Sequence, residues 1–181
     1  MGAIGKKNHI YNIKEEPSLL NGVHNILEEA KQNEYIVGNQ VNIEEIIKQQ
    51  YPQILLEFRP LDSEISGELI KNKDAWHMII NSNHSKTRQR FTMGHELGHY
   101  VYHRRETLQF VDTLFYRQNE LKSSIEYMAD EFAALLLMPE ELIKSCLSKG
   151  INNVGLLAST FGVSNEAMTY RLQQLNYKIS Y

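Results

Sequence analysis

Apolar residues at the start of the chain recur at helical spacing. A helix is predicted from about Ser18 to Gln32, because its apolar residues fall on one face: Leu19, Val23, Ile26, Leu27 and Ala30. A second helix is predicted to begin at Asn42, which can cap it while Glu45 stands three residues on. Val41 and Ile46 occupy the two positions of a hydrophobic staple, which supports this start. The segment before Ser18 is polar and is expected to be loose.

The pattern then changes from a helical period to alternation. Ile54, Leu56 and Phe58 alternate with their neighbours, as residues of a half-buried strand do. Residues 68–70 and 75–80 predict two further strands joined by a polar turn. The middle of the chain is therefore expected to form a sheet.

The next predicted helix, from about Ser85 to His103, carries the most informative motif of the chain. Its centre reads His95-Glu96-Leu97-Gly98-His99, a pattern for which we expect roughly 0.03 chance matches in this composition. Histidines four residues apart lie on one helical face, about 6 Å apart along the axis, so both can reach one metal ion. Glu96 projects beside that face, where it can take a proton from the water that the metal activates.

The second half of the chain is predicted to be mainly helical. Residues 104–121 are mixed, and we expect a loop with a short helical piece there. Residues 124–138 have a helical period, and Pro139 ends that helix and opens another. Two further helices are predicted at residues 153–161 and 165–176.

Two histidines do not complete a catalytic zinc site, which uses three protein ligands and leaves one position to water. A histidine six residues after His99 would be one completion, but that position is Arg105. His103 continues the stripe of His95 and His99, yet the stripe drifts about 40° per four residues, and one straight helix rarely supplies three converging ligands. Glu126, on the next helix, can bind the metal while Asp130 accepts a hydrogen bond from a ligand imidazole. Judged by spacing alone, it is equally possible that Glu126 and Asp130 only form an acidic stripe on the solvent-exposed side of their helix.

Two segments resemble the ImmA/IrrE family of metallopeptidases. Residues 88–103, RQRFTMGHELGHYVYH, are similar to the active helix of that family, and residues 126–139, EYMADEFAALLLMP, to its second block. The resemblance covers roughly residues 42–181. It implies a gluzincin-type fold in which His95, His99 and Glu126 are the zinc ligands. It also implies that Glu96 is the general base.

We therefore expect an α+β fold, with a small zincin-like domain in which a mostly antiparallel sheet of three or more strands packs on the helix that carries HExxH. Residues 1–150 are expected to form this metallopeptidase domain. Residues 151–181 resemble a helix-turn-helix packed on it, with Gly162 in the turn and Ser164 capping the second helix. Only Arg171 and Lys178 are basic in this segment, which does not favour direct nucleic-acid binding.

The cofactor and the remaining chemistry follow from this ligand set. Zn²⁺ is the expected metal, although Mn²⁺ or iron can use the same ligand types. The residue that stabilises the oxyanion cannot be ranked from sequence; the candidates are His77, His103, Tyr100, Tyr102 and Arg88. An extended peptide substrate is expected to add to the sheet edge that overlooks the active helix.

Composition and charge limit the class of protein and its expected location in the cell. With 42% hydrophobic and 23% charged residues, the 181-residue chain can bury a core. Its net charge of −3 does not favour electrostatic attraction to nucleic acid or to an anionic membrane. Cys146 is the only cysteine, and no secretory or membrane-spanning run is seen, so a cytoplasmic location is expected.

The function expected from these features is that of a zinc endopeptidase that cleaves one regulatory protein, such as a helix-turn-helix repressor of a mobile element or stress response. The alternative is a non-catalytic, metal-containing regulatory or DNA-binding protein. Glu96 argues against this alternative, because a structural metal site needs no general base.

Overall fold

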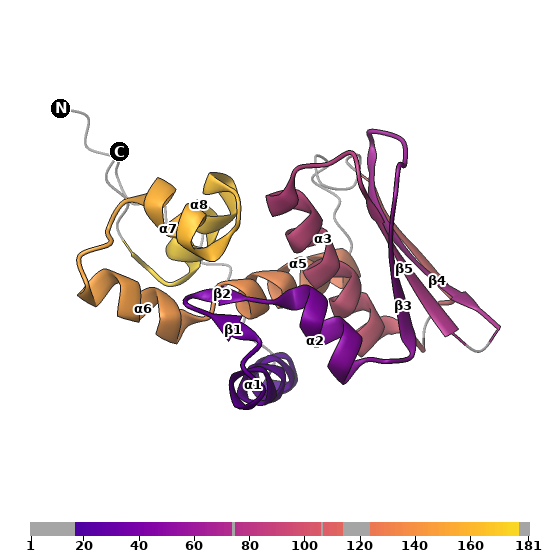
Figure 1. Cartoon of the computed structure of the whole chain (residues 1–181), viewed down its shortest axis with the longest axis horizontal. Helices are drawn as coiled ribbons and strands as arrows, with labels where there is room; N and C mark the ends of the chain where they lie inside the picture. Colours follow the sequence, from indigo (N-terminus) through magenta and orange to yellow (C-terminus); the bar gives the residue numbers. More distant parts are fainter. Residues whose placement is uncertain (1–16, 74, 106, 114–123, 178–181) are drawn as a thin grey trace.

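The computed structural model describes residues 17–73, 75–105, 107–113 and 124–177 (Figure 1). A four-stranded sheet lies at one side, a layer of helices covers its inner face, and a cluster of C-terminal helices lies at the other end. This arrangement confirms the expected α+β fold. None of the helices in the described part of the chain is long and apolar enough to cross a membrane.

The main sheet has the order β3-β5-β4-β6. Its strands are β3 Ile54–Arg59, β4 Ile65–Asn72, β5 Ala75–Asn81 and β6 Gln109–Thr113. Strand β4 pairs antiparallel with both β5 and β6, whereas β3 runs parallel to β5. A small hairpin of β1 Ile36–Val37 and β2 Gln40–Val41 precedes this sheet; both are too short to give a readable alternation in the sequence.

Strand β6 differs from the sequence prediction. Residues 104–121 were expected to form a loop with a short helical piece, but Gln109–Thr113 pairs with β4 along one edge of the sheet. Phe110 and Asp112 are the buried residues of this strand. A carboxylate at an inward position breaks the apolar alternation by which a strand is recognised, so the prediction failed here. Residues 114–121 lie outside the described part of the chain.

The helices follow the predicted order. They are α1 Pro17–Gln32, α2 Ile43–Gln50, α3 Lys86–Gly98, η1 His99–His103, α5 Ser124–Leu137, α6 Glu140–Ser148, α7 Val154–Phe161 and α8 Asn165–Gln174. The side chain of Asn42 caps α2 by accepting from the Glu45 amide, as predicted. The helix that carries the HExxH motif is not uniform, because it changes from α-helix to a π-turn at His99.

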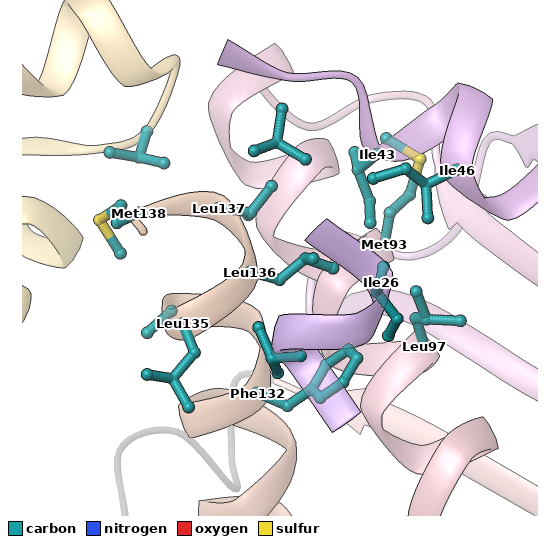
Figure 2. Packing of buried hydrophobic residues seen from close by; sticks show 14 of the residues in the cluster. Ile26, Ile43, Ile46, Met93, Leu97, Phe132, Leu135, Leu136, Leu137 and Met138 are labelled. Atoms are coloured by element: carbon teal, nitrogen blue, oxygen red, sulfur yellow. The ribbon is translucent and has the colours of Figure 1, made fainter. Parts of the chain in front are cut away.

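Helix α3 packs closely against α5, and this contact forms the centre of the core (Figure 2). A Cβ added at Gly94 would lie 3.1 Å from the Ala133 Cβ, and one added at Gly98 would lie 3.1 Å from the Ala129 Cα. These glycines therefore let the two helix backbones approach. Leu97 and Phe132 fill the adjoining space and are fully buried.

The C-terminal helix pair is anchored to the rest of the chain by buried polar groups. Gly162 forms the turn with a positive φ of 65°, and Ser164 caps α8. The guanidinium of Arg90 donates to the carbonyl of Gly162 at 3.1 Å, and that of Arg171 donates to the carbonyl of Met138 at 3.2 Å. Residues 151–177 are therefore joined to the preceding part of the chain by these hydrogen bonds as well as by the chain itself.

We predict that Gly98→Val lowers the free energy of unfolding by about 1–3 kcal/mol, because the new side chain overlaps the α5 backbone. Thermal and urea unfolding would measure the effect. Asn25→Val, which introduces the same side chain at an exposed position of α1, is the control. A parent-like stability for Gly98→Val would show that the α3–α5 approach is not tight.

Candidate metal centre

The two histidines of the HExxH motif converge on one point. They lie at the C-terminal end of α3 and the first position of η1, and both side chains are buried. The Nε2 atoms of His95 and His99 are 3.0 Å apart. Four-residue spacing on one helical face brings them together, as the sequence predicts.

Helix α5 brings a carboxylate to the same point. The two oxygens of Glu126 lie 3.2 Å from His95 Nε2 and 3.3 Å from His99 Nε2. In a tetrahedral zinc site with bonds of about 2.0–2.2 Å, neighbouring ligand atoms are about 3.3–3.6 Å apart, within a few tenths of an ångström of these distances. The three side chains therefore match the chemistry and the spacing that zinc requires, and they form one of the candidate metal groups of the described residues.

Each histidine also has a partner for its outer ring nitrogen. His95 Nδ1 lies 2.7 Å from an oxygen of Asp130, one turn beyond Glu126 on α5. His99 Nδ1 lies 3.3 Å from Nδ1 of His103, which is 3% exposed. Such partners fix which nitrogen of a ligand imidazole carries the proton.

The surroundings of the two histidines favour protonation of His95 and disfavour protonation of His99. Burial opposes protonation of His95, but hydrogen bonds to Asp130 and Glu126 outweigh it and hold the pKa of His95 well above its ordinary value. Burial and the neighbouring His95 keep the pKa of His99 below its ordinary value. Burial also opposes ionisation of Glu126, yet hydrogen bonds from both histidines bring the pKa of Glu126 far below its usual range. Binding of a metal ion by His95 would therefore require the loss of a proton from its Nε2.

Glu96 is fully buried on the side of α3 that faces the sheet. A Cβ added at Gly67 of β4 would lie 2.6 Å from the Thr92 Cγ2 and 3.4 Å from Glu96 Oε1. Glycine at this position therefore lets β4 approach Thr92 of α3, which brings β4 to ordinary contact distance from the Glu96 carboxylate. The carboxylate stands beside the ligand histidines rather than among the three ligand atoms.

Asp112 is a site residue that the sequence did not reveal. It lies on β6, paired with Gly67, and is 3% exposed. One of its oxygens, a nitrogen of His95 and an oxygen of Glu96 lie within 4.8 Å of one another. The negative charge of Asp112 also contributes to the rise in the pKa of His95 and opposes the burial that lowers the pKa of His99. Recognising it from sequence would have required the strand assignment of residues 109–113.

The oxyanion candidates are not gathered around the metal centre. His77 projects from the face of β5 opposite to the buried Trp76 and Met78, where its Nδ1 lies 2.9 Å from a Glu57 oxygen. The Tyr100 hydroxyl accepts from Gln53 at 2.7 Å.

Two further candidates are also committed to other contacts. The Tyr102 hydroxyl donates to the carbonyl of Leu19 at 3.4 Å, and Arg88 donates to Ser66 at 2.8 Å. The fifth candidate, His103, contacts Nδ1 of His99, the ring nitrogen opposite the Nε2 that lies near His95 and Glu126.

We predict that Glu126→Ala lowers zinc affinity by more than the roughly 10–100-fold that an outer hydrogen-bond partner contributes, whereas Asp130→Asn falls within that range. Competition with a chromophoric chelator would measure both. The control is Glu131→Ala on the same helix, because the Glu131 carboxylate accepts from Gln174 rather than facing the histidines. Parent-like zinc binding by Glu126→Ala would mean that the third ligand is another residue.

Comparison with known proteins agrees with this geometry. The family model of the IrrE N-terminal-like domain, peptidase M78, matches residues 49–173. Metallopeptidase ImmA of Bacillus subtilis (strain 168) is 28% identical over 115 residues, which are 62% of this chain and 65% of that protein. A Mycobacterium tuberculosis transcriptional regulator shares the fold with a TM-score of 0.60 and 16% identity, over 86% of this chain and 46% of that one.

The chain thus spans less than two thirds of the length of each of these two relatives. Because the family model covers more than half of the chain, including the HExxH helix and Glu126, this chain belongs to the ImmA/IrrE family of metallopeptidases.

Proposed function

We propose that this chain is a zinc endopeptidase that cleaves one specific regulatory protein. The observation that carries the proposal is the convergence of His95, His99 and Glu126 on one point, with the buried Glu96 carboxylate beside it. Three ligands and an adjacent general base are the composition of a catalytic zinc site, whereas structural sites use four protein ligands.

Each residue of the site has a distinct role in the proposed hydrolysis. Zinc, when bound, activates water and polarises the scissile carbonyl. Glu96 takes the proton of the attacking water and returns it to the departing amine. Asp130 holds His95 in the tautomer whose Nε2 faces the metal position. Glu126 contributes the negative charge that offsets part of the ion's charge.

Strand β6 is the proposed docking edge for the substrate backbone. It is the last strand in the order β3-β5-β4-β6, and it bears Phe110 and Asp112 on the side that faces the ligand histidines. An extended peptide that pairs with the outer edge of β6 would run beside Glu96. Main-chain pairing of this kind binds a peptide without requiring a particular sequence.

Specificity is proposed to come from the C-terminal helices, and the partner to be a helix-turn-helix repressor in the cytoplasm. The similarity to Metallopeptidase ImmA supports a protein substrate. Two polar residues of α8 do not serve for docking, because Arg171 is 2% exposed and Gln174 donates to Glu131. Exposed Leu156 on α7 and Gln173 on α8 remain as surface positions.

The alternative of a DNA-binding regulator is less well supported. A reader of DNA needs several basic side chains that reach phosphates. Between residues 151 and 177, Arg171 is the only arginine or lysine, and its guanidinium donates to the Met138 carbonyl. Lys178 lies outside the described residues. The similarity to a transcriptional regulator, at 16% identity, concerns the fold alone.

We predict that Glu96→Gln keeps zinc but abolishes peptide-bond cleavage, because the base is lost while all three ligands remain. Zinc content of the purified variant and intact-mass spectrometry after co-expression with helix-turn-helix repressors of the same genome would test this. Glu131→Gln, the same change at another buried glutamate, should cleave as the parent does. Full activity of Glu96→Gln would refute the hydrolytic mechanism.

We further predict that Leu156→Ser and Gln173→Glu reduce cleavage of the cognate repressor at least several-fold, while zinc content and thermal stability stay at parent values. Leu156 is 60% exposed, so its replacement removes surface rather than core. The matched control is Leu55→Ser, an exposed leucine on β3 at the far edge of the sheet. Salt-sensitive, sequence-selective DNA binding by the purified parent would instead favour the regulator alternative.

A further inference from the structure

The two ligand histidines have unequal outer partners. His95 faces the carboxylate of Asp130, whereas His99 faces a second imidazole, that of His103, with 3.3 Å between the two Nδ1 atoms. The rings of His99 and His103 have centroids 5.4 Å apart and are tilted by 56°. Both residues are almost completely buried, so their ring nitrogens have little access to bulk water.

The π-turn explains how His103 reaches this position. In a continuous α-helix, a residue four positions on is rotated by about 40°, which would carry His103 away from the line of His95 and His99. Residues His99–His103 instead form a π-turn, whose hydrogen bonds join residues five apart. A π-turn rotates less per residue than an α-turn, so it offsets the drift and carries the His103 ring back beneath that of His99.

Strand β6 restrains the same ligand from a second direction. The ring of Phe110 stacks on His99 with centroids 4.4 Å apart and planes within 14° of parallel. The stack fixes the plane of the imidazole but supplies no hydrogen bond. Within that plane, the Nε2 side of His99 faces Glu126 at 3.3 Å and the Nδ1 side faces His103 at 3.3 Å, so His103 is the partner on the outer side of the ring.

We propose that His103 is a positioning residue that fixes the tautomer and orientation of the metal ligand His99; this inference rests on the proposed zinc site. For Nε2 of His99 to face the metal, its Nδ1 carries the proton and donates it in a hydrogen bond. His103 Nδ1 accepts that bond, so His103 carries its own proton on Nε2. Residue 103 acts through His99 and does not touch the substrate.

The variants His103→Leu and His103→Asn separate this role from packing. Leucine keeps a buried side chain but removes the acceptor, whereas the amide oxygen of asparagine stands near the former Nδ1 and can accept. Zinc affinity, measured by chelator competition, is expected to fall about 10–100-fold in His103→Leu and to be largely restored in His103→Asn. Tyr102→Phe, which changes a hydrogen bond of the same π-turn toward Leu19, is the control and should bind zinc as the parent does.

A spectroscopic test on the parent does not depend on the stability of any variant. In the zinc-loaded parent, nitrogen-15 NMR of the histidine rings should show His103 protonated at Nε2 and unprotonated at Nδ1. In the cobalt-substituted protein, the exchangeable Nδ1 proton of His99 should give a shifted resonance that His103→Leu loses and His103→Asn keeps.

These experiments distinguish failure of the proposed zinc site from failure of the positioning role of His103. A parent that binds no zinc would overturn the proposed function itself. A parent that binds zinc, combined with Nδ1 protonation of His103 or with parent-like affinity and resonances in His103→Leu, would overturn the positioning role alone.

Discussion

The close approach of α3 and α5 is the constraint on which the metal centre depends. Gly94 and Gly98 lie on the face of α3 that contacts Ala129 and Ala133, so the two helix axes come nearer than ordinary side chains would allow. At this separation, the short reach of Glu126 and Asp130 suffices for contact with His95. A wider separation would leave the two acids at the packing boundary without partners. The same contact that buries Leu97 and Phe132 therefore also sets the ligand geometry.

Charge explains why these buried polar groups are tolerated. Carboxylates and imidazoles taken from water are costly unless they are paired, and here they are arranged around one point where a cation lowers that cost. Glu126 contacts both histidines, Asp130 contacts the outer nitrogen of one of them, and Asp112 approaches from the sheet. These three carboxylates and two imidazoles supply the oxygen and nitrogen donors that a divalent cation uses.

The sheet contributes more than support for the helix. Gly67 on β4 lets the strand approach Thr92 of α3 beside Glu96, and the neighbouring β6 brings Phe110 against His99 and Asp112 toward His95. Because β6 follows the active helix in the chain and returns to pair with β4, the metal centre is enclosed between helix and sheet edge. Strand β6 thus restrains the His99 ring through the Phe110 stack. Under the proposed function, the outer side of the same strand would pair with the extended peptide.

The sequence by itself determined the helices, three of the four strands of the main sheet, and the pairing of His95 with His99, because these depend on periodicity and on spacing within one helix. Spacing alone left Glu126 and Asp130 as a possible surface stripe, and the resemblance favoured Glu126 as the third ligand. The structure brings both carboxylates to His95. Tertiary structure decided the rest. The π-turn that brings His103 to His99 has no periodic signature, and Asp112 reaches the site through a strand pairing between distant segments. Arg171, which looks like a surface cation in the sequence, is buried because the carbonyl of Met138, 33 positions away, accepts its hydrogen bond. Contacts between segments far apart in the chain leave no local pattern, so no reading of the sequence alone could supply them.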